Sequence, residues 1–210
     1  MIKMKTVVFA AMGLSASLSI FAQTDSIKET DRFIKAGGAT AQAVAQTSLQ
    51  TKSALDAYNA LLQGNSKDMK GDYKKLQNAQ KDMNNHVADT RKTVDEMDKQ
   101  AGVYFAARSE AIGQIQDLTM RDQAKSRLEA SKMAYDNVKT SLKSAGDALA
   151  PFTKDLSDHI KYLGAELTPS AAASLKPQAE TLNKHGETLF AQADGAVTTA
   201  NKYFATLRAE

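Results

Sequence analysis

Three histidines, His86, His159 and His185, are the side chains of this sequence best suited to bind a metal or haem, or to relay protons. They are far apart, and neither Glu-x-x-His nor His-Glu-x-x-His occurs, so the spacings of di-iron bundles and zinc proteases are missing. His159 could ligate a metal or haem together with Met83 or Met97 from a neighbouring helix. It could also be a polar residue that fixes helix register, which is the reading we favour.

The methionines and one arginine are candidates for binding a partner or ligand rather than for catalysis. Met69, Met83 and Met97 recur every 14 residues, as in a plastic binding groove or, more often, a helical core. Arg108 falls on the apolar side of the same segment and would either form a register-setting ion pair or extend to solvent. Five lysines near the start of the segment alternate with aspartates, which favours a solvated face over an anion site: Lys67, Lys70, Lys74, Lys75 and Lys81.

Catalytic signatures are missing from the sequence. There is no Gly-x-Ser-x-Gly, phosphate loop or dinucleotide fingerprint. The acidic residues fall on polar faces, where nothing would shift their pKa values for acid–base work. We therefore expect a protein that is not an enzyme, and the sequence assigns no catalytic residue, no metal ligand and no cofactor.

The clearest pattern concerns shape. One apolar row recurs every seven residues without a break, at Leu128, Tyr135, Leu142, Leu149, Leu156 and Leu163. A second row is offset by three residues, at Ser131, Val138, Ala145, Phe152 and His159. Two such rows are typical of a helix that packs along its length against another helix.

The same periodicity extends over most of the chain and predicts an all-α fold. We expect four long helices and one short helix, at 26–63, 67–118, 120–163, 169–175 and 177–207. Because short turns join them, they should pack as an elongated, antiparallel four-helix bundle or coiled coil.

Several boundaries depend on single residues. Gly37–Gly38 should bend or fray the first helix, and Pro151 should kink the third helix without ending it. Ser66 could cap the second helix. Thr119 and Asp122 resemble a capping box, which predicts a break near 117–122; the alternative is one continuous helix over 67–163.

The N-terminus resembles a secretory signal. Lys3 and Lys5 precede an apolar stretch of about 15 residues, shorter than the roughly 20 needed to span a membrane, and Ala22 suits a signal peptidase. We expect residues 1–22 to be removed and 23–210 to form one domain in the periplasm, or secreted. The alternative is a retained membrane anchor.

Charge and cysteine content limit the partners. Without Lys3 and Lys5 the chain has 25 Lys and Arg against 24 Asp and Glu, which argues against a nucleic-acid-binding protein. With no cysteine, disulfides are impossible. No later segment is apolar enough to span a membrane, so we expect no integral segment after signal cleavage.

Several packing and turn segments resemble those of exported bacterial coiled-coil proteins in a domain-of-unknown-function family, DUF2959. They are Tyr58–Leu62, the turn at Gly64–Tyr73, Leu118–Asp122, Ala150–Phe152, His159–Leu163 and Ala171–Leu175. The resemblance implies an all-helical envelope protein with no assigned activity, so no site residues follow from it.

These observations predict a non-catalytic cell-envelope scaffold or adaptor that contacts other envelope proteins, or itself, through helix faces. The alternative is a small-ligand sensor or carrier with a cavity inside the bundle, flanked by polar residues such as Thr90, Arg108 and His159. A helical pore-forming protein is a weaker alternative, because its best apolar hairpin, Ala101–Ala107, is short.

Overall fold

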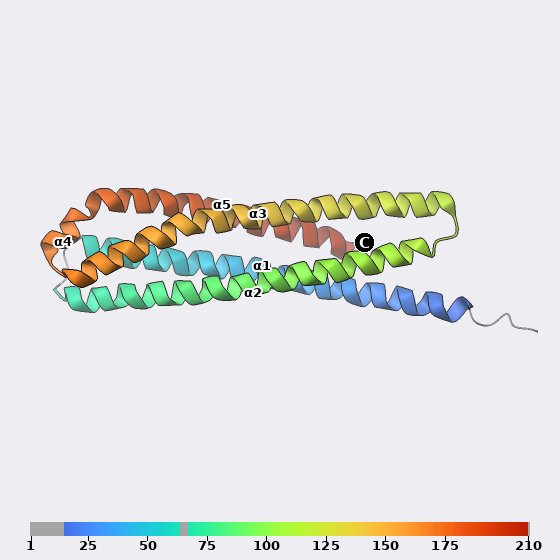
Figure 1. Cartoon of the computed structure of the whole chain (residues 1–210), viewed down its shortest axis with the longest axis horizontal. Coiled ribbons are helices and arrows are strands. Elements are labelled where there is room, and N and C mark those ends of the chain that lie inside the picture. The colour runs from blue at the N-terminus through green and yellow to red at the C-terminus, as the bar shows by residue number, and fades with distance from the viewer. Residues whose placement is uncertain (1–14, 64–66, 210) are drawn as a thin grey trace, which may run out of the picture.

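The computed structural model describes residues 15–63 and 67–209, with side chains from residue 27 onward. The described residues form helices and turns without strands, which confirms the all-α prediction (Figure 1). The elements are α1 (Ser15–Leu62), α2 (Met69–Gly113), α3 (Leu118–Ala165), α4 (Pro169–Ser174) and α5 (Lys176–Ala209). The first fourteen residues of the expected signal peptide lie outside the described part.

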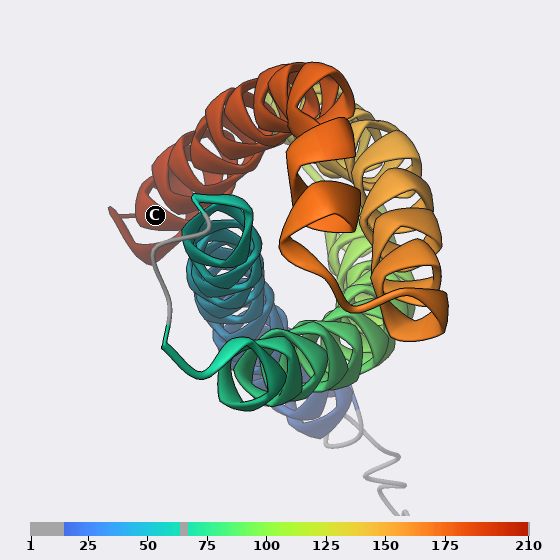
Figure 2. The ribbon, with the colours of Figure 1, turned by 90° about the vertical axis from the view of Figure 1, so that its left-hand side faces the viewer.

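The four long helices run side by side as an elongated bundle. Figure 2, a view along the rod, places them around a common axis, with the short α4 at the near end. The 48 residues of α3 correspond to roughly 70 Å at about 1.5 Å per residue. In Figure 1, α5 ends well before the turn between α2 and α3, so this turn projects beyond the C-terminus.

The break between the second and third helices is real, so the alternative of one continuous helix over 67–163 is wrong. However, α2 ends at Gly113 rather than near 118, and α3 begins at Leu118. Its cap is Asp117, whose carboxylate accepts a hydrogen bond of 2.8 Å from the backbone N–H of Met120. The capping role predicted for Thr119 is wrong, because that residue is already helical and Asp117 has the extended backbone that a cap requires.

The remaining helix-breaking residues do not end their helices. As predicted, α3 continues through Pro151, and Figure 1 shows it changing direction where its colour passes from yellow to orange. Against prediction, α1 continues unbroken through Gly37–Gly38, because Gly37 lies against the ring of Phe204 and tertiary packing offsets its low helix propensity. Ser66 lies outside the described residues; the described cap of α2 is Asp68.

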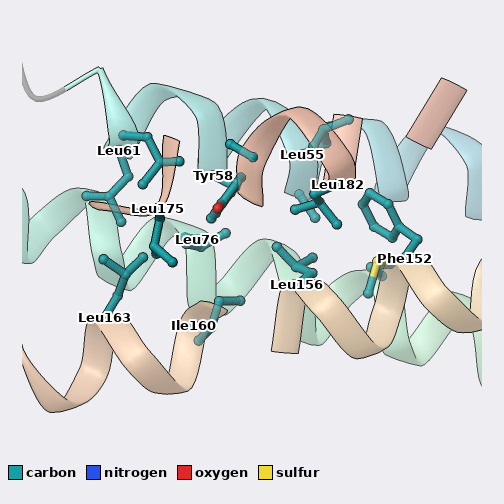
Figure 3. Close-up of a cluster of buried hydrophobic side chains, with 14 of the residues drawn as sticks. Leu55, Tyr58, Leu61, Leu76, Phe152, Leu156, Ile160, Leu163, Leu175 and Leu182 are labelled. Carbon is teal, nitrogen blue, oxygen red and sulfur yellow. The ribbon is translucent and has the colours of Figure 1, made fainter. Parts of the chain in front are cut away.

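A first hydrophobic cluster, the base cluster, fills the bundle near α4. Figure 3 shows leucines and aromatic rings from α1, α2, α3 and α5 converging there. Its fully buried members include Tyr58, Leu76, Phe152, Leu156 and Leu182. These large apolar side chains supply the hydrophobic free energy that holds the four helices together at this end.

A second hydrophobic cluster, the aromatic cluster, lies farther along the rod. Phe33 of α1 is fully buried at its centre, with the rings of Tyr104, Tyr135, Tyr203 and Phe204 within 5.0 to 6.0 Å of its own. These tilted and edge-on contacts are favourable geometries for aromatic pairs. The heptad rows contain Tyr135 but did not point to Phe33 as its partner.

The apolar row of α3 is not uniformly buried. Leu128, Tyr135, Leu156 and Leu163 are buried, whereas the two central members, Leu142 and Leu149, are half-buried. These two lie between the base and aromatic clusters. The middle of the bundle therefore lacks the close packing of its two ends.

Candidate functional site

A cavity of about 390 Å³ occupies this loosely packed middle section. Its walls are α2 and α3, its floor is formed by α1 and α5, and residues on both sides belong to the two clusters described above. We call it the α2–α3 cavity. The lining residues that are exposed to solvent all come from α2 and α3, so the cavity opens between the two wall helices.

The walls of the α2–α3 cavity are mainly apolar. Val87 and Val94 come from α2, Leu142 and Leu149 from α3, and Leu189 from α5. The half-burial of the two α3 leucines is explained by this position, since Leu149 packs against the base cluster and Leu142 against the aromatic cluster, while each also lines the cavity. An apolar ligand would remove their exposed surface from water.

Threonine hydroxyls where the floor meets the α2 wall are already satisfied. Thr47 of α1 and Thr90 of α2 share a hydrogen bond of 2.8 Å, and the hydroxyl of Thr51 donates to the carbonyl of Thr47, also at 2.8 Å. A hydroxyl whose hydrogen bond is made within the protein has less need of a polar partner from a ligand. The floor therefore behaves as a largely apolar surface.

Small residues explain why the cavity is not filled. Ala145, Gly146 and Ala193 line it where longer side chains would occupy the space. A Cβ atom added at Gly146 would meet no other atom within 4 Å. The opening is thus a consequence of residue size at a few positions on helices whose spacing is set elsewhere.

Two hydrogen bonds set the alignment of the wall helices. The hydroxyl of Tyr135 on α3 donates to Asp98 of α2 at 2.5 Å, and the hydroxyl of Tyr73 on α2 donates to the backbone carbonyl of Ile160 on α3 at 3.0 Å. Burial, and then the hydrogen bond to Asp98, raise the pKa of Tyr135, so its hydroxyl stays protonated and donates. These contacts lie on either side of the cavity and fix one antiparallel register across it.

Charged side chains surround the opening. Arg91, Asp95 and Asp98 lie on the α2 side, and Lys139 and Lys143 lie on the α3 side. The lysines pair within α3: Lys139 contacts Asp136 at 2.9 Å and Lys143 contacts Asp147 at 2.6 Å. Among the described residues, Arg91 and Asp95 form no ion pair or hydrogen bond.

The histidines do not gather at the cavity. His159 is half-buried, with Nδ1 2.8 Å from the hydroxyl of Tyr58, and burial lowers its pKa. Nδ1 of His185 lies 3.1 Å from Asp155. In the part of the chain that the structure describes, no three His, Cys, Asp or Glu side chains are grouped as metal ligands.

The cavity that the carrier hypothesis requires is present, but its predicted polar residues are mostly elsewhere. Thr90 does line it. Arg108 and His159 do not: Arg108 is half-buried nearer the α2–α3 turn, and His159 contacts the base cluster. Heptad spacing places a residue on a helix face but cannot decide at which level along the rod a void occurs.

The positions of the methionines and lysines agree with the roles that the sequence favoured, a helical core and a solvated face. Met83 and Met97 are fully buried, and Met69 packs against the base cluster. The five lysines in and just before the start of α2 are exposed, and Lys75 pairs with Asp72 at 2.8 Å. The first group is core and the second is a solvated face.

Sequence reasoning missed most of the cavity lining. The available signal was the presence of small or hydroxylated residues at seam positions of successive heptads, such as Ser48 and Ala145. Gly146, beside Ala145, gave a further hint. None of these residues carries a chemical signature by itself.

A family model described as "Protein of unknown function (DUF2959)" matches residues 26–207. No curated protein and no solved structure matches the chain. Within the described helices, none has a stretch both long and apolar enough to cross a membrane.

Proposed function

The chain belongs to the DUF2959 family, and we propose that it is a non-catalytic binding protein of the bacterial periplasm that carries a small apolar ligand in the α2–α3 cavity. The single observation that carries this proposal is the cavity itself. Its volume of about 390 Å³ falls within the range of roughly 300–1,000 Å³ that is typical of small-molecule sites.

The chemistry of the cavity supports an apolar ligand. Half-buried leucines and valines form the walls, and the hydroxyls of Thr47 on the floor and Thr90 on the α2 wall bond to each other. Each Å² of apolar surface removed from water contributes about 25 cal/mol. The lateral opening lets a ligand enter without separating the helices at either cluster, which suits reversible carriage.

The location rests on the N-terminal sequence. A basic start, a short apolar stretch and a small residue at Ala22 favour export with removal of residues 1–22. In an aqueous envelope compartment, an apolar molecule needs a protein surface to shield it. A small-ligand carrier is consistent with such a location.

Binding can be tested with N-phenyl-1-naphthylamine, an uncharged probe that fluoresces in apolar sites. The protein has no tryptophan, so the background emission is low. We expect saturable enhancement with the wild type and its loss in Gly146→Leu, whose side chain would occupy the cavity. Gly195→Leu is the matched control, because Gly195 is an open helical position that does not line the cavity.

Two results would contradict ligand carriage: no saturable enhancement with the wild type, or equal enhancement with Gly146→Leu. Circular dichroism of each variant, with its thermal midpoint, shows that the bundle is intact. Because both substitutions replace glycine in a helix with leucine, their effects on helix propensity should be similar.

A second candidate function is the envelope scaffold, and one observation favours it. Leu118 and Met120 are 64% and 63% exposed at the α2–α3 turn, which projects past the end of α5 (Figure 1). Exposed apolar side chains at the end of a rod suit the apolar face of a partner helix. The partner would be another envelope protein or a second copy of this chain.

Crosslinking in intact cells tests the scaffold. A crosslinkable residue placed beside Met120 should give a defined adduct that disappears in Leu118→Gln/Met120→Gln. Leu49→Gln is the control, because Leu49 is 59% exposed on α1, far from the turn. An adduct pattern that does not change with the double variant would exclude this surface as the contact.

A further inference from the structure

We propose that the α2–α3 cavity takes a single-chain anionic amphiphile, with the acidic head between Arg91 and Lys143 and the chain along the apolar walls. This inference rests on the proposed function, because it requires that the cavity bind a ligand. It adds the chemical class of that ligand and the residues that select it.

The register of the wall helices places the two cations opposite each other. Tyr135 of α3 bonds to Asp98 of α2. Arg91 lies seven residues before Asp98 on α2, and Leu142 lies seven residues after Tyr135 on α3. Because the two helices are antiparallel, Arg91 is level with Leu142 and its neighbour Lys143. Both Arg91 and Lys143 line the cavity.

The same register separates the carboxylates from this level. Asp95, three residues before Asp98, is level with Val138 and its neighbour Lys139, about one helical turn from the level of Arg91. Asp98 accepts the Tyr135 hydrogen bond one turn farther on. The acidic side chains of the rim therefore lie on the side of Arg91 that faces the aromatic cluster.

Near the level of Arg91 the rim carries two cations, of which one is unpaired within the described part of the chain and the other is paired only at the surface. Arg91 has no ion pair among the described residues, and the partner of Lys143 is Asp147 of its own helix, an exposed pair. Such an exposed pair contributes about 0–1 kcal/mol, so Lys143 is readily redirected. Two like charges across an opening repel, and an anion between them turns the repulsion into two charge-assisted hydrogen bonds.

Space for the head group is available one helical turn from this level. Gly146 lines the cavity one turn after Leu142, and a Cβ atom there would meet nothing within 4 Å. A guanidinium and an ammonium can thus approach a carboxylate, sulfate or phosphate group without displacing other side chains. Arg91 would bind it in bidentate fashion and Lys143 as a point charge.

The length of the cavity favours a single chain. Its α2 wall runs from Val87 to Asp98, about 16 Å at 1.5 Å per residue. An extended hydrocarbon chain can follow this apolar lining along its length, which a compact ring system cannot. Val87 and Leu149 would contact the chain on one side of the head, and Val94 would contact it on the other.

The test uses three probes with the same ten-carbon chain: decanoate, 1-decanol and decyltrimethylammonium. Each is titrated calorimetrically at pH 7.5 against the wild type and Arg91→Gln/Lys143→Gln. Lys92→Gln/Lys154→Gln is the charge-matched control. Its residues are exposed, pair with Asp89 and Asp158, and do not line the cavity.

We expect decanoate to bind the wild type and the control about tenfold more tightly than decanol, since charge-assisted hydrogen bonds are roughly twice as strong as neutral ones. In Arg91→Gln/Lys143→Gln this preference should vanish while decanol affinity is unchanged. Equal affinity for all three probes would overturn the anionic head but leave apolar carriage intact. Preference for decyltrimethylammonium would assign the head to the Asp95 side instead, and binding of no probe would overturn both proposals.

Discussion

The hydroxyl of Tyr58 on α1 lies 2.8 Å from Nδ1 of His159 on α3, and their rings are stacked with centroids 5.4 Å apart. Tyr58 is fully buried, whereas His159 is half-buried. The histidine that the sequence singled out as a candidate metal ligand therefore joins two helices at the base cluster. This relationship has a consequence for the pH dependence of stability.

Burial lowers the pKa of His159 below its ordinary value of 6.5, and the nearby Asp155 and Asp158 oppose this in part. The unfolded chain therefore binds a proton more readily than the native protein. The stability that His159 contributes is complete above pH 6.5 and is lost as the pH falls through and below that value. Urea unfolding at pH 7.5 and 5.5 should show a larger loss for the wild type than for His159→Gln.

The control for this experiment is His86→Gln, which removes a half-buried histidine of α2 that is not in contact with Tyr58. It should keep the pH dependence of the wild type because His159 is intact. If His159→Gln shows the same pH dependence as the wild type, the proton is taken up elsewhere on unfolding.

Adjacent glycines in α1 should respond in opposite ways to alanine. A Cβ atom at Gly37 would overlap the ring of Phe204, whereas one at Gly38 would meet nothing within 4 Å. We expect Gly37→Ala to destabilise the bundle by about 1–3 kcal/mol through overpacking. Gly38→Ala should stabilise it by up to about 1 kcal/mol through helix propensity.

Chemical denaturation of both glycine variants checks this prediction. Gly37→Ala should cost less in a Phe204→Leu background than in the wild type, because the overlapping ring is gone. Equal destabilisation by Gly37→Ala and Gly38→Ala would mean that the Phe204 contact does not control this site.

Two leucines of the same α3 row should differ in their cost of truncation. Leu156 is 0% exposed in the base cluster, and Leu149 is half-buried at the cavity. Leu156→Ala should cost about 2–5 kcal/mol, the usual range for a buried leucine. Leu149→Ala should cost about half as much, since its side chain is already partly exposed to solvent.

The free energies of unfolding, obtained by urea titration, distinguish the two leucines. Decanoate should protect the wild type more than Leu149→Ala, because the truncated wall offers less apolar contact. A cost for Leu149→Ala equal to that for Leu156→Ala would mean that the cavity is closed in solution.

The cap of α3 gives a further matched pair. Asp117→Ala removes the carboxylate that accepts from the N–H of Met120 and should cost about 1 kcal/mol. Thr119→Ala changes a residue already within the helix and should be nearly neutral. Thermal unfolding of the two variants decides which residue begins the helix, and a larger cost for Thr119→Ala would restore the capping box predicted from the sequence.

The sequence by itself determined that this protein is a long helical bundle. The chain has apolar residues every seven positions, few glycines and short polar turns. This pattern predicts a bundle, because each helix can bury its apolar stripe only against another helix. The row from Leu128 to Leu163 and the burial of Met83 and Met97 follow from periodicity alone. The seam pattern also placed Thr90 on an inward face.

Tertiary structure alone decided at which levels side chains pack the interior of the bundle and at which level a cavity remains. Large rings such as Phe33 and Phe152 fill the two clusters, while Ala145, Gly146 and Ala193 meet at one level and leave a void. Which residues share a level depends on the relative register of the helices, set by contacts such as Tyr135 to Asp98. The sequence contains the period of each stripe but not the alignment between stripes, and that alignment puts Arg91 level with Leu142, the neighbour of Lys143.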